Sequence, residues 1–484
     1  MIIASFLVIL AVFLIVGLAS ARVATGERKD YYIAGQSVSP WLTGLSAVAT
    51  NNSGYLFIGV IGYTYATGLS AIWLMFGWII GDYLGSLFIH RKLRNATGVT
   101  GEASFASVMS RWHGEEFAYW RRIAAVIMVI FLGAYAAAQI SAGGKALEGV
   151  LDIDPRLGAV AVAGMIIAYS IAGGIRASIW TDAVQSLSML VALTILCVVA
   201  FAAEGGIGGA FASMMPLDDG RYMNLWPESG ELVGTGAMAI GFFVLGWLFA
   251  GFSVVGQPHI MVRFMALDDE KNMQRTRAWY YSFFVLFYIL AAGLGLLSRL
   301  YLPELASDDT ELALPRMALE LLPDVFVGLI LAGIFAATMS TADSVVLSCS
   351  AAITHDLTPE RMEHPLLLKG ATAGTTIVAL LLALSGDQSV FTLVILAWST
   401  LAAAFAPLLT LYALNRKTSE GAAIFLMVLG VAIALVWRYG LGWHGGIYEG
   451  LPGIAVPLIL GWFLSRPATK AEIAESPMEE APAE

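Results

Sequence analysis

The chain has 484 residues, of which 58% are hydrophobic and only 13% are charged, and its mean hydropathy is +0.77. This composition excludes a soluble enzyme of this length, because too little polar surface would be left to face water. It indicates an all-α polytopic membrane protein. The formal net charge of −10 resides mainly in loops and in the acidic end of the chain, and it does not indicate a nucleic-acid partner.

Thirteen apolar runs are long enough to cross about 30 Å of hydrocarbon. The first has no basic segment in front of it and is followed by Arg22, so we expect a retained span rather than a cleaved signal peptide. The predicted spans are 2–21, 41–64, 69–90, 122–149, 157–174, 181–203, 233–256, 276–300, 323–354, 365–385, 389–413, 420–438 and 450–466.

Lys and Arg are distributed unevenly between the loops on the two sides of these spans. The loops after odd-numbered spans, together with the C-terminal tail, hold 20 of the 26 basic residues. Because basic loops stay in the cytoplasm, we expect the N-terminus outside and the C-terminus inside. Residues 467–484 are acidic and rich in Ala and Pro, so they are predicted to be a disordered cytosolic tail.

Two of the predicted spans are interrupted by residues that break helices. The second contains "SAVATNNSGYLFIGVIG" and the seventh contains "LFAGFSVVGQPHIMVRFMA". Each is the first of five spans if spans 2–6 and 7–11 form two halves, and such a pair is the best sequence pointer to a transporter binding site. The alternative is that the glycines only allow close helix packing. We favour that alternative for any single glycine, but not for both breaks together.

The ninth span, "FVGLILAGIFAATMSTADSVVLSCSAAIT", has one polar face. At 100° per residue, this face carries Ser340, Thr341, Asp343, Ser344 and Ser348, together with Ala337. Oxygen ligands without nitrogen or sulfur favour a hard cation over a transition metal. Hydroxyls that bond back to helix carbonyls would explain Ser348, but an acid inside the membrane is a functional candidate. Asp182, which opens the sixth span, is a second such acid and could face the same space.

Four separated motifs, "DYYIAGQSVSPWLTGLSAVATNNSGYLFIG", "IAGGIRASIWTDAVQ", "GQPHIMVRFMA" and "AATMSTADS", resemble the sodium:solute symporter family, nearest to the bacterial sodium/proline symporters. The resemblance runs from about residue 25 to residue 415. It implies a bacterial inner-membrane protein with a leucine-transporter-like core of two inverted five-helix repeats. The implied segments are 1–40 (first span and loop), 41–203 (first repeat), 204–413 (second repeat) and 414–466 (two extra spans).

The resemblance also implies sites, with Na⁺ as the coupling ion and a small solute and membrane lipid as the other partners. The sodium site shared by the family corresponds here to main-chain oxygens of Ala49, Asn52 and Ala337 and to the hydroxyls of Ser340 and Thr341. A second sodium, found in some members, corresponds to Asp182, Ser340, Asp343 and Ser344. The expected substrate-binding residues are Asn51, Ser53, Gly54, Tyr135, Trp247 and Val254.

Some positions depart from the pattern of the proline symporters. Those proteins typically have Asp where this chain has Asn51, although sugar symporters of the family have Asn there. They have Trp and Tyr where this chain has Ala250 and Val254. Tyr135 does match the substrate-facing tyrosine of the fourth span. The motifs therefore favour the family more strongly than they favour proline.

The leading hypothesis is sodium-driven import of a small polar solute, with proline as the first choice. Another amino acid, a betaine, a monocarboxylate or a sugar is the alternative. A channel would need a continuous polar lining, an enzyme would need a motif such as HExxH, and a transporter-like sensor would carry a signalling domain; we find none of these in the sequence.

His259 is interpreted as structural. Asp82 and Lys145 lie near span ends, so we expect both to reach toward water.

Overall fold

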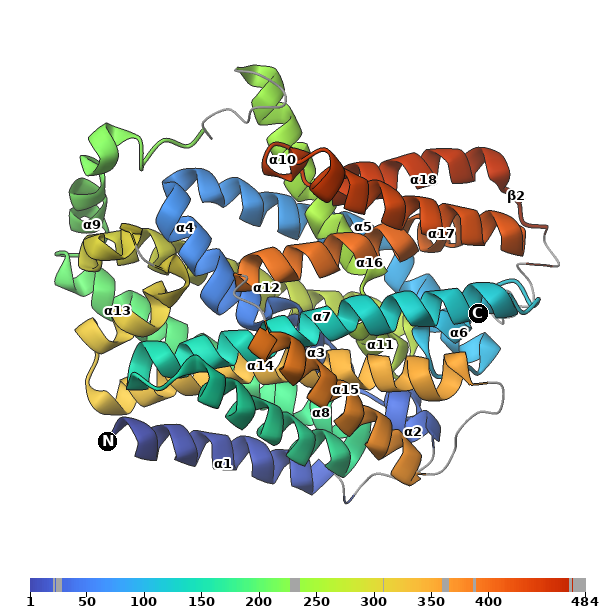
Figure 1. Cartoon of the computed structure of the whole chain (residues 1–484), viewed down its shortest axis with the longest axis horizontal. Helices are drawn as coiled ribbons and strands as arrows, with labels where there is room; N and C mark the ends of the chain where they lie inside the picture. The colour runs from blue at the N-terminus through green and yellow to red at the C-terminus, as the bar shows by residue number, and fades with distance from the viewer. Residues whose placement is uncertain are drawn as a thin grey trace, which may run out of the picture.

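The structure is a computed structural model, and it is built almost entirely of helices that run side by side (Figure 1). It describes residues 1–20, 22, 28–226, 236–307, 309–358, 365–385, 389–469 and 472. The helices of the N-terminal half are α1 (Ile2–Ser20), α2 (Arg28–Ile33), α3 (Pro40–Gly54), α4 (Ile61–Thr67), α5 (Ile72–Thr100), α6 (Phe105–Ser110), α7 (Ala118–Leu151), α8 (Pro155–Ala203) and α9 (Ile207–Met214).

The C-terminal half continues the bundle and adds one short pair of strands, β1 (Arg416–Lys417) and β2 (Arg466–Pro467), which are antiparallel. Its helices are α10 (Ala237–Phe252), α11 (Pro258–Met265), α12 (Met273–Tyr301), α13 (Ala313–Leu321), α14 (Asp324–Ala351), α15 (Pro365–Ser385), α16 (Val390–Ala413), α17 (Glu420–Leu435) and α18 (Gly450–Leu464).

Ten helical stretches of the described residues are long and apolar enough to cross a membrane. One of them, Pro40–Thr100, holds the second and third predicted spans, which meet at Gly68 with φ of 69°. In the same way α8 holds the fifth and sixth spans on either side of Gly174 (φ 59°, ψ −150°), a conformation that glycine adopts without strain. The shorter apolar helix Gly450–Leu464 matches the thirteenth span. Each predicted span thus has a helical counterpart among the described residues, which confirms the all-helical membrane class.

The second predicted span is interrupted where the sequence predicts. α3 ends at Gly54, and a π-helical turn, Tyr55–Val60, leads into α4. Ser53 has φ 33° and ψ 177°, values outside any helix. A Cβ at Gly54 would lie 2.7 Å from Cγ2 of Thr338, so only glycine lets the broken segment approach α14 this closely.

The seventh predicted span is also broken. One turn of 3₁₀-helix, Ser253–Gly256, follows α10, and Gln257 is extended (φ −98°, ψ 100°) before Pro258 opens α11. Proline suits the first turn of a helix because its missing N–H would have no partner there. The Gln257 amide donates to the Trp398 carbonyl at 2.9 Å, which ties the break to α16.

α14 runs through the middle of the bundle and packs against α8, α7, α3 and α1. Almost every residue from Val327 to Ala351 is buried. Because no water reaches such a helix from lipid, its hydroxyls and carboxyl must find partners on neighbouring helices, in ordered water or in a ligand. The polar face predicted for this helix therefore lies inside the protein.

α5 and α10 pack closely against each other at glycine residues. A Cβ at Gly81 of α5 would lie 1.9 Å from the carbonyl oxygen of Leu248. A Cβ at Gly251 of α10 would lie 2.1 Å from the carbonyl oxygen of Trp78. Small residues let the backbones of membrane helices come this close. This contact holds α10, and the break that follows it, against α5.

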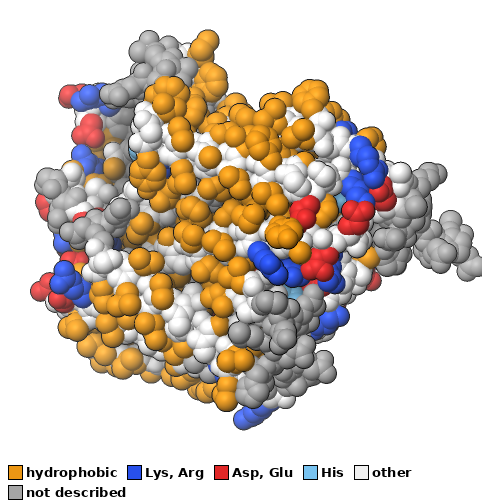
Figure 2. Space-filling model, turned by 45° about the vertical axis from the view of Figure 1, so that its right-hand side comes forward, with side chains coloured by type: hydrophobic (Ala, Val, Ile, Leu, Met, Phe, Trp, Pro, Cys, Tyr) orange, Lys and Arg blue, Asp and Glu red, His pale blue; other side chains and the backbone are white. Residues whose placement is uncertain are grey.

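The surface matches a protein immersed in lipid. In Figure 2, hydrophobic side chains cover a broad band, and most charged side chains gather toward the two sides of it. Large exposed apolar side chains include Leu7 and Ile15 of α1, Val428 of α17 and Phe463 of α18. Such a continuous apolar band would be unfavourable in water, so it marks the surface that faces the membrane.

The two ends of the described chain lie at opposite ends of the bundle in Figure 1, with the N-terminus at the left and β2 at the right. β2 pairs with β1, and the carboxylate of Glu472 lies 2.6 Å from the Arg466 guanidinium. The first residues of the predicted tail are thus held against the protein. Residues 470, 471 and 473–484 of that tail lie outside the described residues. The division into two repeats and a tail stays a prediction in its boundaries.

Candidate functional site

The broken end of α3 lies against the polar face of α14. The Ser340 hydroxyl is 3.2 Å from the Ala49 carbonyl oxygen and 3.1 Å from that of Ala337, and it donates to these acceptors. The Thr341 hydroxyl donates to the Thr50 carbonyl oxygen at 2.8 Å. All of these residues are fully buried. The structure therefore brings together four of the five residues predicted for the shared sodium site.

Asn52 is the fifth of these residues. Its carbonyl oxygen accepts a hydrogen bond from the Tyr55 backbone N–H, and a second lone pair remains available to a cation. Its side chain is 1% exposed, yet neither Oδ1 nor Nδ2 has a hydrogen-bond partner among the described residues. Buried polar atoms are rarely left without a partner, so this amide indicates that a polar occupant binds here.

The five residues present carbonyl and hydroxyl oxygens without a formal charge. Sites for Ca²⁺ and Mg²⁺ include carboxylates, whereas transition metals favour nitrogen or sulfur ligands. Neutral oxygens at this depth therefore fit a monovalent hard cation such as sodium. Freed backbone oxygens of an unwound membrane helix are the usual ligands of such an ion in transporters.

Two of the residues predicted for a second sodium, Asp182 and Ser344, contact a buried arginine. Asp182 of α8 accepts a hydrogen bond from the Ser46 hydroxyl at 2.6 Å. The Arg263 guanidinium of α11 donates to the Ser178 hydroxyl at 2.6 Å and to the Ser344 hydroxyl, and it lies 3.5 Å from Oδ2 of Asp182. The Arg263 and Asp182 side chains are both 0% exposed. The chain thus supplies its own cation at this place.

Ser344 lies between the residues predicted for the shared sodium site and those predicted for the second one. Its hydroxyl lies 2.5 Å from the Ser340 carbonyl oxygen, 3.0 Å from Oδ1 of Asp343 and 3.3 Å from the Thr50 hydroxyl. A hydroxyl has only one hydrogen to donate, so the Ser340 carbonyl and the Asp343 carboxylate compete for it, whereas the Thr50 hydroxyl can itself be a donor. Ser340, Asp343 and Ser344 share one region, as the helical periodicity predicts.

Three of the predicted substrate-binding residues also meet. The Tyr135 hydroxyl donates to the Ser53 hydroxyl at 3.3 Å. The Gly54 N–H donates to the side-chain oxygen of Gln139 at 2.9 Å. The ring of Tyr135 lies 5.2 Å from the ring of His259 and 6.4 Å from that of Trp398. The broken segment of α3 thus borders an aromatic corner built from α7, α11 and α16.

Several buried polar atoms around this corner have no hydrogen-bond partner in the part of the chain that the structure describes. They are Nε2 of Gln139, Oε1 of Gln257 and both ring nitrogens of His259. A polar solute can satisfy such atoms. The sequence pattern predicts Gln257 only as part of the second break, favours a structural role for His259 and does not indicate Gln139 or Trp398. Their nearness to the two breaks was the available signal, because "GQPHI" directly follows the second break.

The other three predicted substrate-binding residues make different contacts. The Asn51 amide lies 2.5 Å from the hydroxyl of Tyr280. Trp247 stacks on Tyr448 at 6.4 Å between ring centroids. Val254 is buried in the turn before the second break, where its carbonyl accepts from the Gln257 N–H at 3.0 Å. Their part in substrate binding stays a prediction.

Asp82 and Lys145 receive partners in the structure. Asp82 is 0% exposed and accepts from the Tyr280 hydroxyl at 2.6 Å, so the expectation that it reaches toward water is wrong. The cause is the packing of α12 against α5, which places Tyr280 on this carboxyl group. Lys145 forms ion pairs with Asp309 at 2.5 Å and with Glu311 at 2.6 Å. Glu311 also accepts the N–H groups of Val390 and Phe391 at the start of α16.

Known proteins share both the sequence pattern and the fold. The high-affinity proline transporter PutP of Bacillus subtilis is 29% identical over 91% of this chain and 93% of its own length. The sodium/proline symporter of Staphylococcus aureus (strain bovine RF122 / ET3-1) is 28% identical over 94% of this chain and 90% of its own length.

Two solved structures resemble the fold. A Na⁺-coupled sialic acid symporter, described as a substrate-bound outward-open state with a novel Na⁺ site, gives a TM-score of 0.77 at 20% identity and covers 97% of this chain and 99% of that one. The nucleobase-cation-symport-1 transporter MHP1 gives a TM-score of 0.57 at 14% identity, and the match covers 92% of this chain and 98% of that one. These likenesses confirm the leucine-transporter-like fold. The model of the sodium:solute symporter family matches residues 31–430. The chain therefore belongs to the sodium:solute symporter family.

Proposed function

We propose that this chain is a sodium-coupled symporter of the cell membrane that imports a small polar solute, with proline as the first choice. The observation that carries the proposal is the contact of Ser340 and Thr341 with carbonyl oxygens beside the break in α3. Membership of the family supports the coupling ion. The names of the bacterial relatives support proline.

The broken segment of α3 gives the coupling a physical basis. The proposed sodium ligands Ala49 and Asn52 are followed directly by Ser53 and Gly54, which border the aromatic corner at Tyr135. Sodium bound to the carbonyl oxygens fixes the backbone that the solute then contacts. Fixing this segment costs conformational entropy. The first ligand to bind has already fixed it, so the second ligand binds more tightly. Each ligand must therefore raise the affinity for the other by the same factor.

The membrane potential makes this coupling useful. One sodium ion moving inward through about 100 mV releases about 2.3 kcal/mol. That free energy can hold the solute concentration inside the cell at roughly fifty times the concentration outside, before any sodium gradient is added. The sodium gradient and the membrane potential set the direction of net transport, and the basic loops predict the orientation, with the N-terminus outside.

The direct test is transport by the purified protein in sealed vesicles. An inward sodium gradient is expected to drive accumulation of labelled proline inside the vesicles. Unlabelled proline that is then added outside is expected to accelerate the release of the labelled proline by exchange. Equal concentrations of other amino acids, betaines, monocarboxylates and sugars should compete less well. Uptake that persists without sodium contradicts the coupling. Stronger competition by another solute contradicts only the choice of proline.

Tyr135→Phe is expected to raise the KM for the solute about fivefold, while the sodium dependence changes little. The change removes one hydroxyl that is hydrogen-bonded to Ser53, and a hydrogen bond of this kind contributes about 1 kcal/mol. Initial uptake rates at saturating sodium measure the effect. Tyr65→Phe is the control, because the Tyr65 hydroxyl binds the Leu302 carbonyl at 2.6 Å instead. An unchanged KM in the Tyr135 variant would count against its role.

A further inference from the structure

Asp82 is a buried acid on α5 that the proposed sodium and solute sites do not use. Its side chain is 0% exposed, and its Oδ2 accepts a hydrogen bond from the Tyr280 hydroxyl of α12 at 2.6 Å. An acid inside a membrane protein is unfavourable without partners and is a functional candidate by default. The hydrogen bonds that lead away from Asp82 identify the element on which it acts.

Two hydrogen bonds in series join Asp82 to the broken helix α3. A hydroxyl has one hydrogen. Tyr280 donates it to Asp82, so the Tyr280 oxygen is left to accept from Nδ2 of Asn51 at 2.5 Å. Oδ1 of Asn51 has no hydrogen-bond partner among the described residues. Tyr280 therefore holds the Asn51 amide, and Asp82 holds Tyr280 in its accepting role.

Close packing fixes the position of Tyr280. α12 and α3 meet at Gly44, where an added Cβ would lie 2.7 Å from Cβ of Trp279. The Tyr280 ring lies edge-on to the ring of Phe264, with 5.9 Å between centroids, and its centroid is 5.3 Å from that of Phe284. Tyr280 is 0% exposed. A ring enclosed in this way turns only if its neighbours repack, so its hydroxyl stays between α3 and α5.

Asn51 belongs to the turn of α3 that carries the proposed sodium ligands Ala49 and Asn52. Toward α14, the Ala49 carbonyl accepts from the Ser340 hydroxyl at 3.2 Å. Toward α12, the Asn51 amide donates to the Tyr280 hydroxyl. The turn is thus held from two helices, and both contacts determine where its carbonyl oxygens lie.

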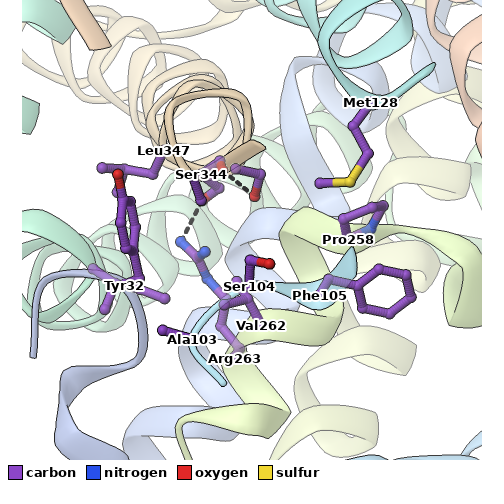
Figure 3. A pocket seen from close by; sticks show the side chains of 13 residues that line it. Tyr32, Ala103, Ser104, Phe105, Met128, Pro258, Val262, Arg263, Ser344 and Leu347 are labelled. Carbon is purple, nitrogen blue, oxygen red and sulfur yellow. Dashed lines mark hydrogen bonds between the residues drawn. The ribbon is translucent and has the colours of Figure 1, made fainter. Parts of the chain in front are cut away.

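The contacts toward α14 are more numerous than those toward α12. The Arg263 guanidinium donates to the Ser344 hydroxyl of α14, as Figure 3 shows, and to the Ser46 hydroxyl of α3 at 3.3 Å. In the part of the chain that the structure describes, Asn51 provides the one side-chain hydrogen bond from residues 49–52 to α12 or α5. The sodium-binding turn therefore depends on Tyr280 for its polar contact on this side.

We infer that Asp82 and Tyr280 are positioning residues of the sodium site, which keep the carbonyl oxygens of Ala49 and Asn52 in place without contacting the ion. The inference rests on the proposed sodium coupling and adds two residues to it. When the turn is released from Tyr280, sodium must order it again, and the lost conformational entropy weakens binding. A carboxyl group keeps an acceptor oxygen with or without its proton, so the contact does not require a buried charge.

The test is the sodium affinity of the purified protein in detergent without solute, measured by equilibrium binding of radioactive sodium. Tyr280→Phe and Asp82→Leu are each expected to weaken binding about fivefold, the effect of one lost hydrogen bond. Saturating sodium is expected to restore the wild-type amount of bound ion. Because both groups act in one series, the double variant is expected to lose no more than either single variant. Asp82→Asn keeps an acceptor oxygen and is expected to stay within about twofold of the wild type.

Tyr412→Phe is the matched control, because it removes a buried hydroxyl that lies 3.3 Å from the Thr418 hydroxyl at the C-terminal end of α16. Its sodium affinity is expected to equal that of the wild type. A dissociation constant does not depend on the yield of folded protein, so a poorly expressed variant still gives a result.

Three results would overturn the inference. They are wild-type affinity in Tyr280→Phe and Asp82→Leu, losses that multiply in the double variant, and a loss in Asp82→Asn as large as that in Asp82→Leu. The last result would show that the charge of Asp82 acts rather than its hydrogen bond. Each of them leaves the proposed sodium coupling intact, whereas a wild type that binds no sodium contradicts both.

Discussion

Ser340→Ala and Thr341→Ala are each expected to raise the sodium concentration for half-maximal uptake between about tenfold and a hundredfold. Each change removes a hydroxyl from the junction of α14 with the broken end of α3. A hydrogen-bonding or ligating group that faces a charge contributes roughly 1.5–3 kcal/mol, which corresponds to this range. Uptake measured over a series of sodium concentrations at constant ionic strength gives the value.

Ser348→Ala is the matched control for these variants. Ser348 lies on the same face of α14, but its hydroxyl donates to the Ser344 carbonyl at 2.9 Å within the helix. We expect its sodium dependence to stay within about twofold of the wild type. If Ser340→Ala and Thr341→Ala lose transport but keep the wild-type sodium dependence, the cation-site interpretation fails.

Gly81→Ala is expected to prevent most of the protein from reaching the membrane in folded form. The added Cβ would lie 1.9 Å from the carbonyl oxygen of Leu248, and that atom belongs to the backbone of α10, so no side chain can move aside. Alanine favours a helix over glycine by about 1 kcal/mol, but overpacking of a tight contact costs typically 1–3 kcal/mol or more. The amount of folded protein and its melting temperature in detergent measure the effect.

Gly241→Ala, on α10 itself, is the control. Among the described residues, no atom outside its own helix turn lies within 4 Å of a Cβ built at Gly241, so only the gain in helix propensity remains. We expect this variant to be as stable as the wild type or slightly more stable. If Gly81→Ala and Gly241→Ala have equal melting temperatures, α5 and α10 can move apart without loss of stability, and the prediction is wrong.

Periodicity and helix-breaking residues were enough to predict much of the architecture. Apolar runs predicted the helices, and the Asn, Ser, Gly and Pro residues inside two runs predicted the breaks at Ser53 and Gln257. The polar face of α14 could be predicted because Ser340 and Ser344 lie one turn apart on a helix. Local spacing determines all of these features, so a single sequence reveals them.

Contacts between distant segments could not be predicted in the same way. Arg263 stands in a quoted motif, yet nothing local indicates that it reaches Asp182 and Ser344, which are 81 residues away on either side. Asp82 lies near the end of its predicted span, yet it is buried and bonded to Tyr280 of α12, which is 198 residues away in the sequence. The aromatic corner also joins Tyr135, His259 and Trp398 from three helices.

Glu311 has a consequence for how the N-terminal end of α16 can move. Its carboxylate caps the first turn of that helix through the N–H groups of Val390 and Phe391, while the same carboxylate holds Lys145 of α7. A carboxylate at a helix N-terminus is stabilised by the helix dipole, so the cap and the ion pair reinforce each other. Because Glu311 lies on a short turn between the two helices, displacing α16 from α7 must break either the cap or the ion pair. One carboxylate thus ties the start of α16 to α7.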